Sequence, residues 1–576
     1  MIPKGKEDAP PEFIFVGGSA LKGRTGVIRS SLARRALSDR RARLHQDASE
    51  RLDSMLKEGQ SSICDCLRSQ ADSANSSTPS RQEGPSYRAI RSKGDTSTRD
   101  PQLYCRACGR SLVPASVSNR QRSSPIPPPQ TFASGNRNPI IPFDPELAAV
   151  RVDEVLNFAA TAIWPSFRLS DHAPSCYRSW IFPYTDKLKV YTTLWSASYH
   201  QDILRFSAGA SPCLDSREQL YLRGLVLKSL REEVGRAAYL SSPDGLVMSV
   251  LFLAVNVAHR TGLRRDLNPF SPPFTELHGL HNYGSRQYHP WHWDIVHTII
   301  DRFGGISSLK AHGLAWLLSI ADVMNAVNTL QKPMYPMLDI QGKVLDLEPP
   351  LCLFPVKPPG EDDSLYPPGS AFHQLLSLCP PVKPEIVSVF LHLGQLASVL
   401  QYYFESVETT TPTILDSLGD CRNQVHHRLF CLPDETDDST LFITSRSKTD
   451  PADLEHSTQI YLACRLAALL YAIHVTFPTP RIAPQQKQLS TALNLKLRWL
   501  VERDASNPLL LWPMFILTLS CGNKASPEWL PHLRRMCANL SVNTSAKLLR
   551  LLRSFAWVDA AFPDFDNSIL PTLLVT

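Results

Sequence analysis

The sequence lacks several features that would each point to a particular class of protein. Its longest apolar runs, such as "LVMSVLFLAVNVA" (246–258), are shorter than the roughly 20 residues that a bilayer requires, so we expect no membrane span. The first residues contain no apolar stretch of the kind that directs export. The 13 cysteines are odd in number and scattered, which favours a reducing intracellular compartment over a disulfide framework.

Motifs that hold phosphates or activate a nucleophile are also missing. There is no GxxxxGK[ST] sequence, and no glycine-rich dinucleotide fingerprint follows a predicted strand. The stretch "FSAGAS" (206–211) is not a nucleophile elbow, because it has no GxSxG pattern and no strand before it. We therefore expect a protein that is not an enzyme and that carries no cofactor.

Cysteine spacing gives one weak candidate for a zinc site. The first quarter of the chain holds two thiol pairs, "CDC" and "CRAC", formed by Cys64, Cys66, Cys105 and Cys108. Four such ligands could bind zinc tetrahedrally, but a long polar, Ser-rich segment separates the pairs. A binuclear zinc cluster would need six closely spaced cysteines, and these are absent. We favour two unrelated thiol pairs and assign no metal.

Histidine spacing gives a second candidate. The stretch "HGLHNYGSRQYHPWHW" (278–293) contains His278, His281, His289 and His292 as two HxxH pairs. Imidazoles at this spacing can bind zinc, but no carboxylate stands at HExxH spacing. We interpret the segment as a partly buried aromatic loop. A helical enzyme that uses these histidines with a metal is the most distant alternative.

Charge is distributed unevenly along the chain. Residues 1–140 hold 23 Lys and Arg against 13 Asp and Glu, whereas the remainder is slightly acidic. Within residues 21–46 eight basic side chains face one acid, and Ile28, Leu32 and Ala36 recur at helical spacing. This pattern predicts a basic amphipathic helix in a basic arm, which we define as residues 1–47.

The basic arm is the segment with the clearest physical partner. We expect contact with DNA phosphates or with a nuclear import receptor, because paired arginines suit both. A solvated or protein-binding helix stays open as the alternative. The candidate contact residues are Arg29, Arg34, Arg35, Arg40, Arg41 and Arg43.

The composition and the hydrophobic periodicity of the sequence change near residue 140. Residues 48–139 are rich in Ser, Pro and Arg and hold few large apolar side chains, so we expect a disordered linker. From 140 to 576 aliphatic residues recur at 3.6-residue spacing, which predicts an all-α domain. The stretch "DSREQLYLRGLVLKSLREEVGRAAYL" is a clear case, in which Ser216 and Gln219 form a capping box. Paired prolines predict a surface loop at about 347–383.

Three stretches of this helical region resemble the fungal-specific transcription factor regulatory domain. "WHWDIVHTIIDRFGGISSL" (291–309) resembles a segment in which two glycines, here Gly304 and Gly305, end a helix. "GLAWLLSIADVMNAVNTLQKPMYP" (313–336) resembles the following helix, with Asp322 at a recurring acidic position. "NPLLLWPMFILTLSCG" (507–522) resembles a late helix, with Trp512, Pro513 and Phe515 in register.

The opening of the chain resembles a subgroup of that family without a zinc cluster. "EFIFV" followed by "IRSSLARRALSDRRAR" is similar to its usual opening, with Leu32 where a histidine is usual. The resemblance implies a nuclear regulator of transcription that acts through protein partners, with auxiliary DNA contact from the basic arm. The alternative is an interaction or ligand-sensing helical scaffold that does not bind DNA.

Overall fold

The computed structural model describes residues 144–563 with short gaps at 183, 208–214, 237–241, 257–265, 285, 357–366, 407–409, 438–440, 444–449, 504–506 and 522–527. These residues form seventeen α-helices and two isolated β-bridges but no strand, which confirms the all-α prediction. The basic arm, the predicted linker at 48–139 and the N-terminal thiol pairs lie outside the described residues.

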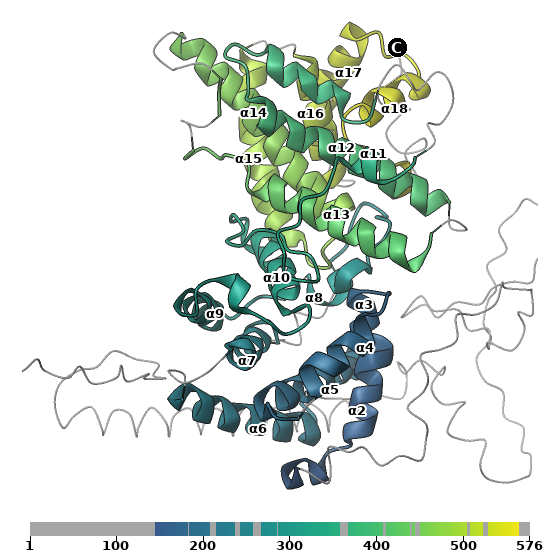
Figure 1. Cartoon of the computed structure of the whole chain (residues 1–576). Coiled ribbons are helices and arrows are strands. Elements are labelled where there is room, and N and C mark those ends of the chain that lie inside the picture. Colours follow the sequence, from purple (N-terminus) through teal and green to yellow (C-terminus); the bar gives the residue numbers. More distant parts are fainter. Residues whose placement is uncertain are drawn as a thin grey trace, which may run out of the picture. The chain divides into compact units, whose positions relative to one another are not determined.

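The helices of the first half enclose one hydrophobic core. A long central helix, α5, packs against α2, α6 and α7, and α7 packs against α9 (Figure 1). The bounds of these helices are α2 Val152–Phe158, α3 Trp164–Phe167, α4 His172–Cys176, α5 Lys187–Ser207, α6 Arg217–Gly235, α7 Asp244–Val255, α8 Leu280–Tyr283 and α9 Pro290–Arg302. Short 3-10 or π turns join or flank some of them: η2 Pro145–Ala149, η3 Ala159–Ile163, η4 Tyr177–Ile181 and η7 Leu277–Gly279.

The helices of the second half enclose a larger core. Helix α14 lies at its centre and packs against α15 and α16, while α12 packs against α13 (Figure 1). The bounds are α11 Pro350–Leu353, α12 Pro384–Glu405, α13 Pro412–Phe430, α14 Pro451–Tyr471, α15 Ala483–Glu502, α16 Leu511–Ser520, α17 Trp529–Asn539 and α18 Ser545–Arg553. The accompanying short turns are η10 Ser370–Ser377, η14 Ala472–Thr476, η15 Pro508–Leu510 and η17 Asp559–Ala561, whereas η8 Ile306–Ser308 follows α9 and packs on the first core.

Helix α10 (Leu314–Thr329) belongs to both cores. Leu314 and Leu318 are buried in the first core, whereas Trp316, Ile320 and Val323 are buried in the second. An ordinary surface helix buries one apolar stripe and exposes its other side to solvent. Helix α10 is buried on two sides, because its sequence "LAWLLSIADVMNAV" is apolar nearly all round. It is therefore the element that joins the two halves.

Local sequence signals explain where several helices begin and end. Ser216 caps α6 by accepting a hydrogen bond from the Gln219 backbone N–H at 3.2 Å, as the predicted capping box requires. The end of α9 is a turn in which Gly305 N–H donates to Ile300 O at 2.9 Å. Gly304 and Gly305 have φ of 89° and 97°, a left-handed conformation that favours glycine. The predicted end of α9 at these glycines is confirmed. The capping box is confirmed only in its Ser216 half, because the Ser216 backbone N–H donates to Asp202 Oδ2 at 2.9 Å and not to the Gln219 side chain.

The late helix α16 is held by aromatic packing. Trp512 is fully buried, its ring lies parallel to that of Phe555, and its indole N–H donates to Ala556 O at 3.0 Å. Phe515 is buried beside Trp557. Trp512 and Phe515 are therefore core residues.

The proline-rich segment predicted as a surface loop at 347–383 is in part helical and buried. It contains α11 and η10, and Phe354, Phe372 and Leu375 lie in the second core. The prolines prevent a long helix, but the apolar stretch around Phe372 packs against α12. Apolar burial therefore outweighs turn propensity in this part of the segment.

Two helices are long and apolar enough to cross a membrane by length and composition alone. These are Pro384–Glu405 and Pro451–Thr476, and 61% and 83% of their most apolar windows are buried inside the protein. Central helices of a water-soluble core meet the same criterion. Their burial is sufficient to explain their apolar composition.

Candidate functional site

Helix α13 places an unusual number of polar side chains inside the protein. Asp416, Arg422, Asn423 and His426 are all almost completely buried. A buried polar group costs free energy unless it is hydrogen-bonded, so each of these side chains needs a partner inside the fold. The partners come mainly from segments more than 100 residues earlier in the chain. The polar side chains of α13 therefore hold distant segments together.

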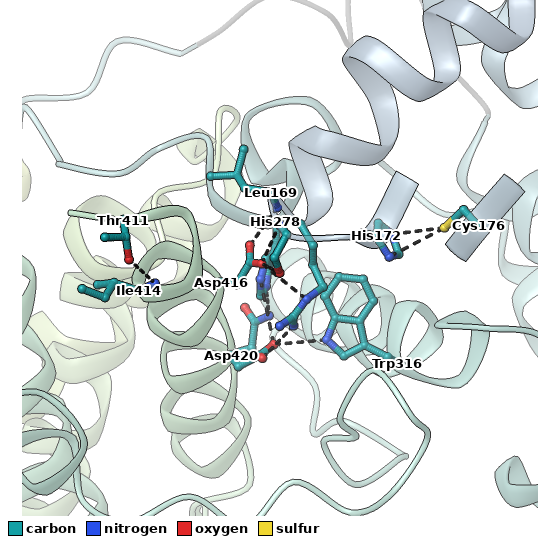
Figure 2. Close-up of polar contacts among 12 residues, drawn as sticks. Leu169, His172, Cys176, His278, Trp316, Thr411, Ile414, Asp416 and Asp420 are labelled. Atoms are coloured by element: carbon teal, nitrogen blue, oxygen red, sulfur yellow. Dashed lines mark hydrogen bonds and ion pairs between the residues drawn. The ribbon is translucent and has the colours of Figure 1, made fainter. Parts of the chain in front are cut away.

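Asp416 holds the segment that follows α3. Its carboxylate accepts hydrogen bonds from the backbone N–H groups of Leu169, at 2.8 Å, and Ser170, at 3.1 Å (Figure 2). The Ser170 hydroxyl also donates to it. The chain separation is 247 residues for the Leu169 contact, so this carboxylate fixes the first half to α13.

Arg168 and Asp420 extend this contact toward α10. Arg168 Nη1 donates to Asp420 Oδ2 at 2.7 Å, and Trp316 Nε1 donates to Asp420 Oδ1 at 3.2 Å (Figure 2). The guanidinium carbon also lies 5.5 Å from the centre of the Trp316 ring. Burial raises the pKa of Asp420, and the Arg168 charge opposes that shift. We call Arg168, Asp416, Asp420 and Trp316 the polar bridge.

His278 packs directly against the polar bridge. Its ring lies 5.2 Å from that of Trp316, and its Nδ1 is 2.8 Å from Asn423 Nδ2. Burial lowers the pKa of His278 well below its usual range, so the ring is neutral. With Asn423 donating to Nδ1, the proton sits on Nε2, which faces Asp420 Oδ1 at 3.9 Å. His278 therefore serves as a buried packing and hydrogen-bonding residue.

The predicted histidine segment does not gather its side chains at one point. His289 and His292 stack on each other at 4.3 Å around the start of α9, whereas His278 lies against α13. His281 lies 2.8 Å from the side-chain nitrogen of Asn282. Within the described part of the chain, no group of three or more His, Cys, Asp or Glu side chains is arranged to hold a metal ion. Residues 278–283 form η7 and α8, where a loop was predicted.

His172 and Cys176, one turn apart on α4, form a pair that the sequence analysis did not single out. The sulfur lies 3.4 Å from Nε2 of the imidazole (Figure 2). Burial lowers the pKa of His172 to about 3 and raises the pKa of the Cys176 thiol. Both groups are held neutral, whereas a reactive cysteine requires a lowered thiol pKa. This pair is a buried packing contact.

The remaining predicted site residues are not placed by the structure. The six arginines of the basic arm and the four N-terminal cysteines lie outside the described residues. No sequence signal pointed to the polar bridge, because Arg168 and Asp420 are ordinary charged residues separated by 252 positions. The nearest available clue was "LGDCRNQVHH" in α13, a polar run inside an otherwise apolar helical pattern.

Asp322, the acidic residue singled out on α10, anchors the chain beyond that helix. It is 2% exposed, and its Oδ2 accepts hydrogen bonds from the backbone N–H groups of Met334 and Tyr335 at 2.6 and 2.8 Å. Burial raises the pKa of this carboxyl to about 6. The recurring acidic position is thus a structural anchor for the segment 334–335.

The raised pKa of Asp322 makes stability depend on pH. Because the folded-state pKa of about 6 lies above the ordinary value of 3.8, the folded protein binds the proton more tightly. Stability therefore falls as pH rises from about 4 to about 6 and is level above that range. We expect Asp322→Asn to lose this dependence. Chemical denaturation measures the free energy of unfolding of both proteins at pH 7 and at pH 5. Between pH 7 and pH 5 this free energy should rise by about 1 kcal/mol more in the wild type than in the variant. An unchanged difference would contradict the prediction.

These features define an all-α domain with two cores joined through one central helix. The model of the fungal-specific transcription factor domain family matches residues 158–559. The chain therefore belongs to this family. The match includes α10, the glycine-terminated α9, the late helix α16 and the whole polar bridge, so the resemblance of the three helical stretches is confirmed. No significant match was found among curated proteins or among solved structures.

Proposed function

We propose that this protein is a nuclear regulator of transcription without catalytic activity. The observation that carries the proposal is the family match over residues 158–559, since the family is one of transcription factor domains. In this proposal the helical body binds protein partners, and those partners supply sequence specificity. The basic arm provides nuclear entry and auxiliary, non-specific contact with DNA phosphates.

Phosphate contact makes a quantitative prediction about salt. A protein that neutralises phosphates with arginine releases condensed counterions, so its affinity for DNA falls steeply as salt rises. We expect the full-length chain to bind labelled duplex DNA at about 50 mM salt and to lose on the order of 10³-fold in affinity by about 200 mM. Fluorescence anisotropy measures both values. Replacing the six candidate arginines by glutamine should abolish binding at the lower salt.

The helical body offers a charge-matched control. The same number of exposed arginines, replaced by glutamine outside the basic arm, should leave DNA affinity within about twofold if the contact is local to the arm. Suitable positions are Arg217, Arg223, Arg231, Arg236, Arg302 and Arg535. Equal losses in the two variants would show a diffuse charge effect and contradict the role of the arm.

The two variants also separate nuclear entry from DNA contact. A fluorescent fusion of the arm variant should leave the nucleus, while the body variant should remain there. If full-length protein binds no DNA at low salt but the arm variant still fails to enter the nucleus, the arm is a targeting segment only. The alternative of an interaction or ligand-sensing scaffold would then replace auxiliary DNA contact.

A further inference from the structure

A cavity lies inside the helical body where the two cores meet. The first core supplies walls from η3, α3, α5 and α7, and α10 supplies the opposite wall through Trp316, Ile320 and Met324. The space not filled by protein atoms measures about 780 Å³, counted with the part that is open to solvent. We call this space the seam cavity. Mostly apolar spaces between packed helices are common places for small-molecule sites.

The walls of the seam cavity are almost entirely apolar. Trp164, Phe167, Trp180 and Phe252 contribute aromatic surface. Native cores pack at nearly crystalline density and rarely leave spaces much larger than a water molecule. An apolar pocket lined by residues of both cores therefore needs a reason.

The few polar groups in the lining mostly bond to the protein itself. Thr193 Oγ1 donates to Lys189 O at 2.8 Å, and the Tyr283 hydroxyl pairs with His200 Nδ1 at 3.0 Å. Tyr288 differs. In the described part of the chain no hydrogen bond reaches its hydroxyl, and the side chain is half-buried at the cavity. Burial raises the pKa of Tyr288, so the hydroxyl keeps its proton and can donate it.

Among the described residues no charged side chain lines the seam cavity, and His172, the one imidazole among them, is neutral because burial lowers its pKa to about 3. A charged ligand would lose its hydration without finding a counter-charge, which is costly in an apolar site. The lining therefore selects against ions. It suits a molecule that offers a large apolar surface and one group able to accept from Tyr288.

Backbone irregularity marks the same place independently. The described residues contain three π-helical turns, η3, η4 and η14, and two of them contribute side chains to this cavity. Ala159 and Ile163 come from η3, and Trp180 comes from η4. Such single turns strain the regular helix and occur frequently at functional sites. Here they set the walls of the space.

We propose that the seam cavity binds a small, uncharged, largely apolar molecule, aromatic or alicyclic, whose hydroxyl or carbonyl oxygen accepts a hydrogen bond from Tyr288. The ligand contacts both cores at once, because α10 forms one wall and α3, α5 and α7 form the other. Occupancy therefore stabilises the junction between the two halves. The proposal concerns direct binding by the helical body and is independent of DNA contact by the basic arm.

The test uses full-length protein and 2-naphthol, a neutral bicyclic probe with one hydroxyl. We expect saturable 1:1 binding in equilibrium dialysis with a Kd on the order of 10–100 µM, and a concentration-dependent rise in Tm. The anionic probe 2-naphthalenesulfonate should bind at least about tenfold more weakly, because the cavity offers no counter-charge. Tyr288→Phe keeps the ring and should weaken 2-naphthol binding about fivefold.

A filling variant and a matched control locate the site. Ala197→Phe places a ring in the cavity from α5 and should abolish binding, whereas Ala546→Phe makes the same change at an exposed position on α18 and should not. If Ala197→Phe fails to fold, the weaker 2-naphthol binding expected of Tyr288→Phe still tests whether the probe binds in the seam cavity. Absence of saturable 2-naphthol binding, or equal binding by wild type and a folded Ala197→Phe, would overturn the proposal. Ligand binding without DNA binding would support this site and contradict only the role of the arm.

Discussion

Replacing Gly394 by alanine is expected to lower the free energy of unfolding by about 3 kcal/mol or more. Gly394 lies in the middle of α12, and a Cβ there would lie 2.2 Å from Phe555 O and 2.4 Å from the Cα of Gly369. Both neighbours are backbone atoms, so no side-chain rotation can relieve the overlap. The helix would have to move away from η10 and from the chain after α18. Urea denaturation followed by circular dichroism measures the loss.

The same substitution at Gly224 provides the matched control. Gly224 lies on the exposed face of α6, and a methyl group added there would have no neighbouring atom within 4 Å. Alanine has the higher helix propensity, so Gly224→Ala should raise stability by about 0.5–1 kcal/mol. The same Gly-to-Ala change is thus expected to lower the free energy of unfolding at Gly394 and to raise it at Gly224. A small loss at Gly394, comparable to ordinary surface changes, would show that α12 does not approach the neighbouring backbone this closely.

Replacing Asp416 by alanine is expected to cost about 3–5 kcal/mol. The change removes the acceptor of the Leu169 and Ser170 N–H groups and takes one of two carboxylates from the neighbourhood of Arg168. Breaking a buried charge contact costs more than the net value of the contact, because the groups left behind stay desolvated. Thermal or chemical denaturation of the full-length protein measures the effect.

Asp294→Ala and a double-mutant cycle complete that experiment. Asp294 is exposed on α9, so its replacement should change stability by no more than about 0.5 kcal/mol. Combining Asp416→Ala with Arg168→Met should give a coupling energy of about 1–3 kcal/mol, since the two residues share one network. Additive effects would show that Arg168 and Asp416 act independently and that the polar bridge is not one unit.

Helical periodicity carried most of the information about the fold. The heavily patterned α6 was predicted within a few residues, because it buries a continuous apolar stripe and has clear end signals such as Ser216. Helix α16 is buried nearly all round, and the resemblance to a late helix of the family indicated it. The segment 347–383 was less predictable. Its prolines indicate turns, but the burial of Phe372 depends on α12, which comes later in the chain. Local propensity cannot report such long-range packing.

The candidate sites were harder to predict than the fold, for the same reason. Arg168 and Asp420 are common surface residues, and only tertiary contact makes them a buried pair. The histidine segment shows the opposite error, since its spacing suggested shared ligands while the fold sends His278 and His289 to different neighbours. A cavity leaves even less trace in a sequence, because its walls are made of the same residue types as any core.

The double burial of α10 determines how this protein can be divided. A fragment that ends before Leu314 would expose the apolar side chains of the first core that normally pack on α10, and a fragment that begins after Thr329 would do the same to the second core. Binding experiments with such fragments would therefore detect non-specific contacts with the exposed apolar surface of an incomplete core. Partners of this protein are better sought with the intact helical body and point substitutions on its surface.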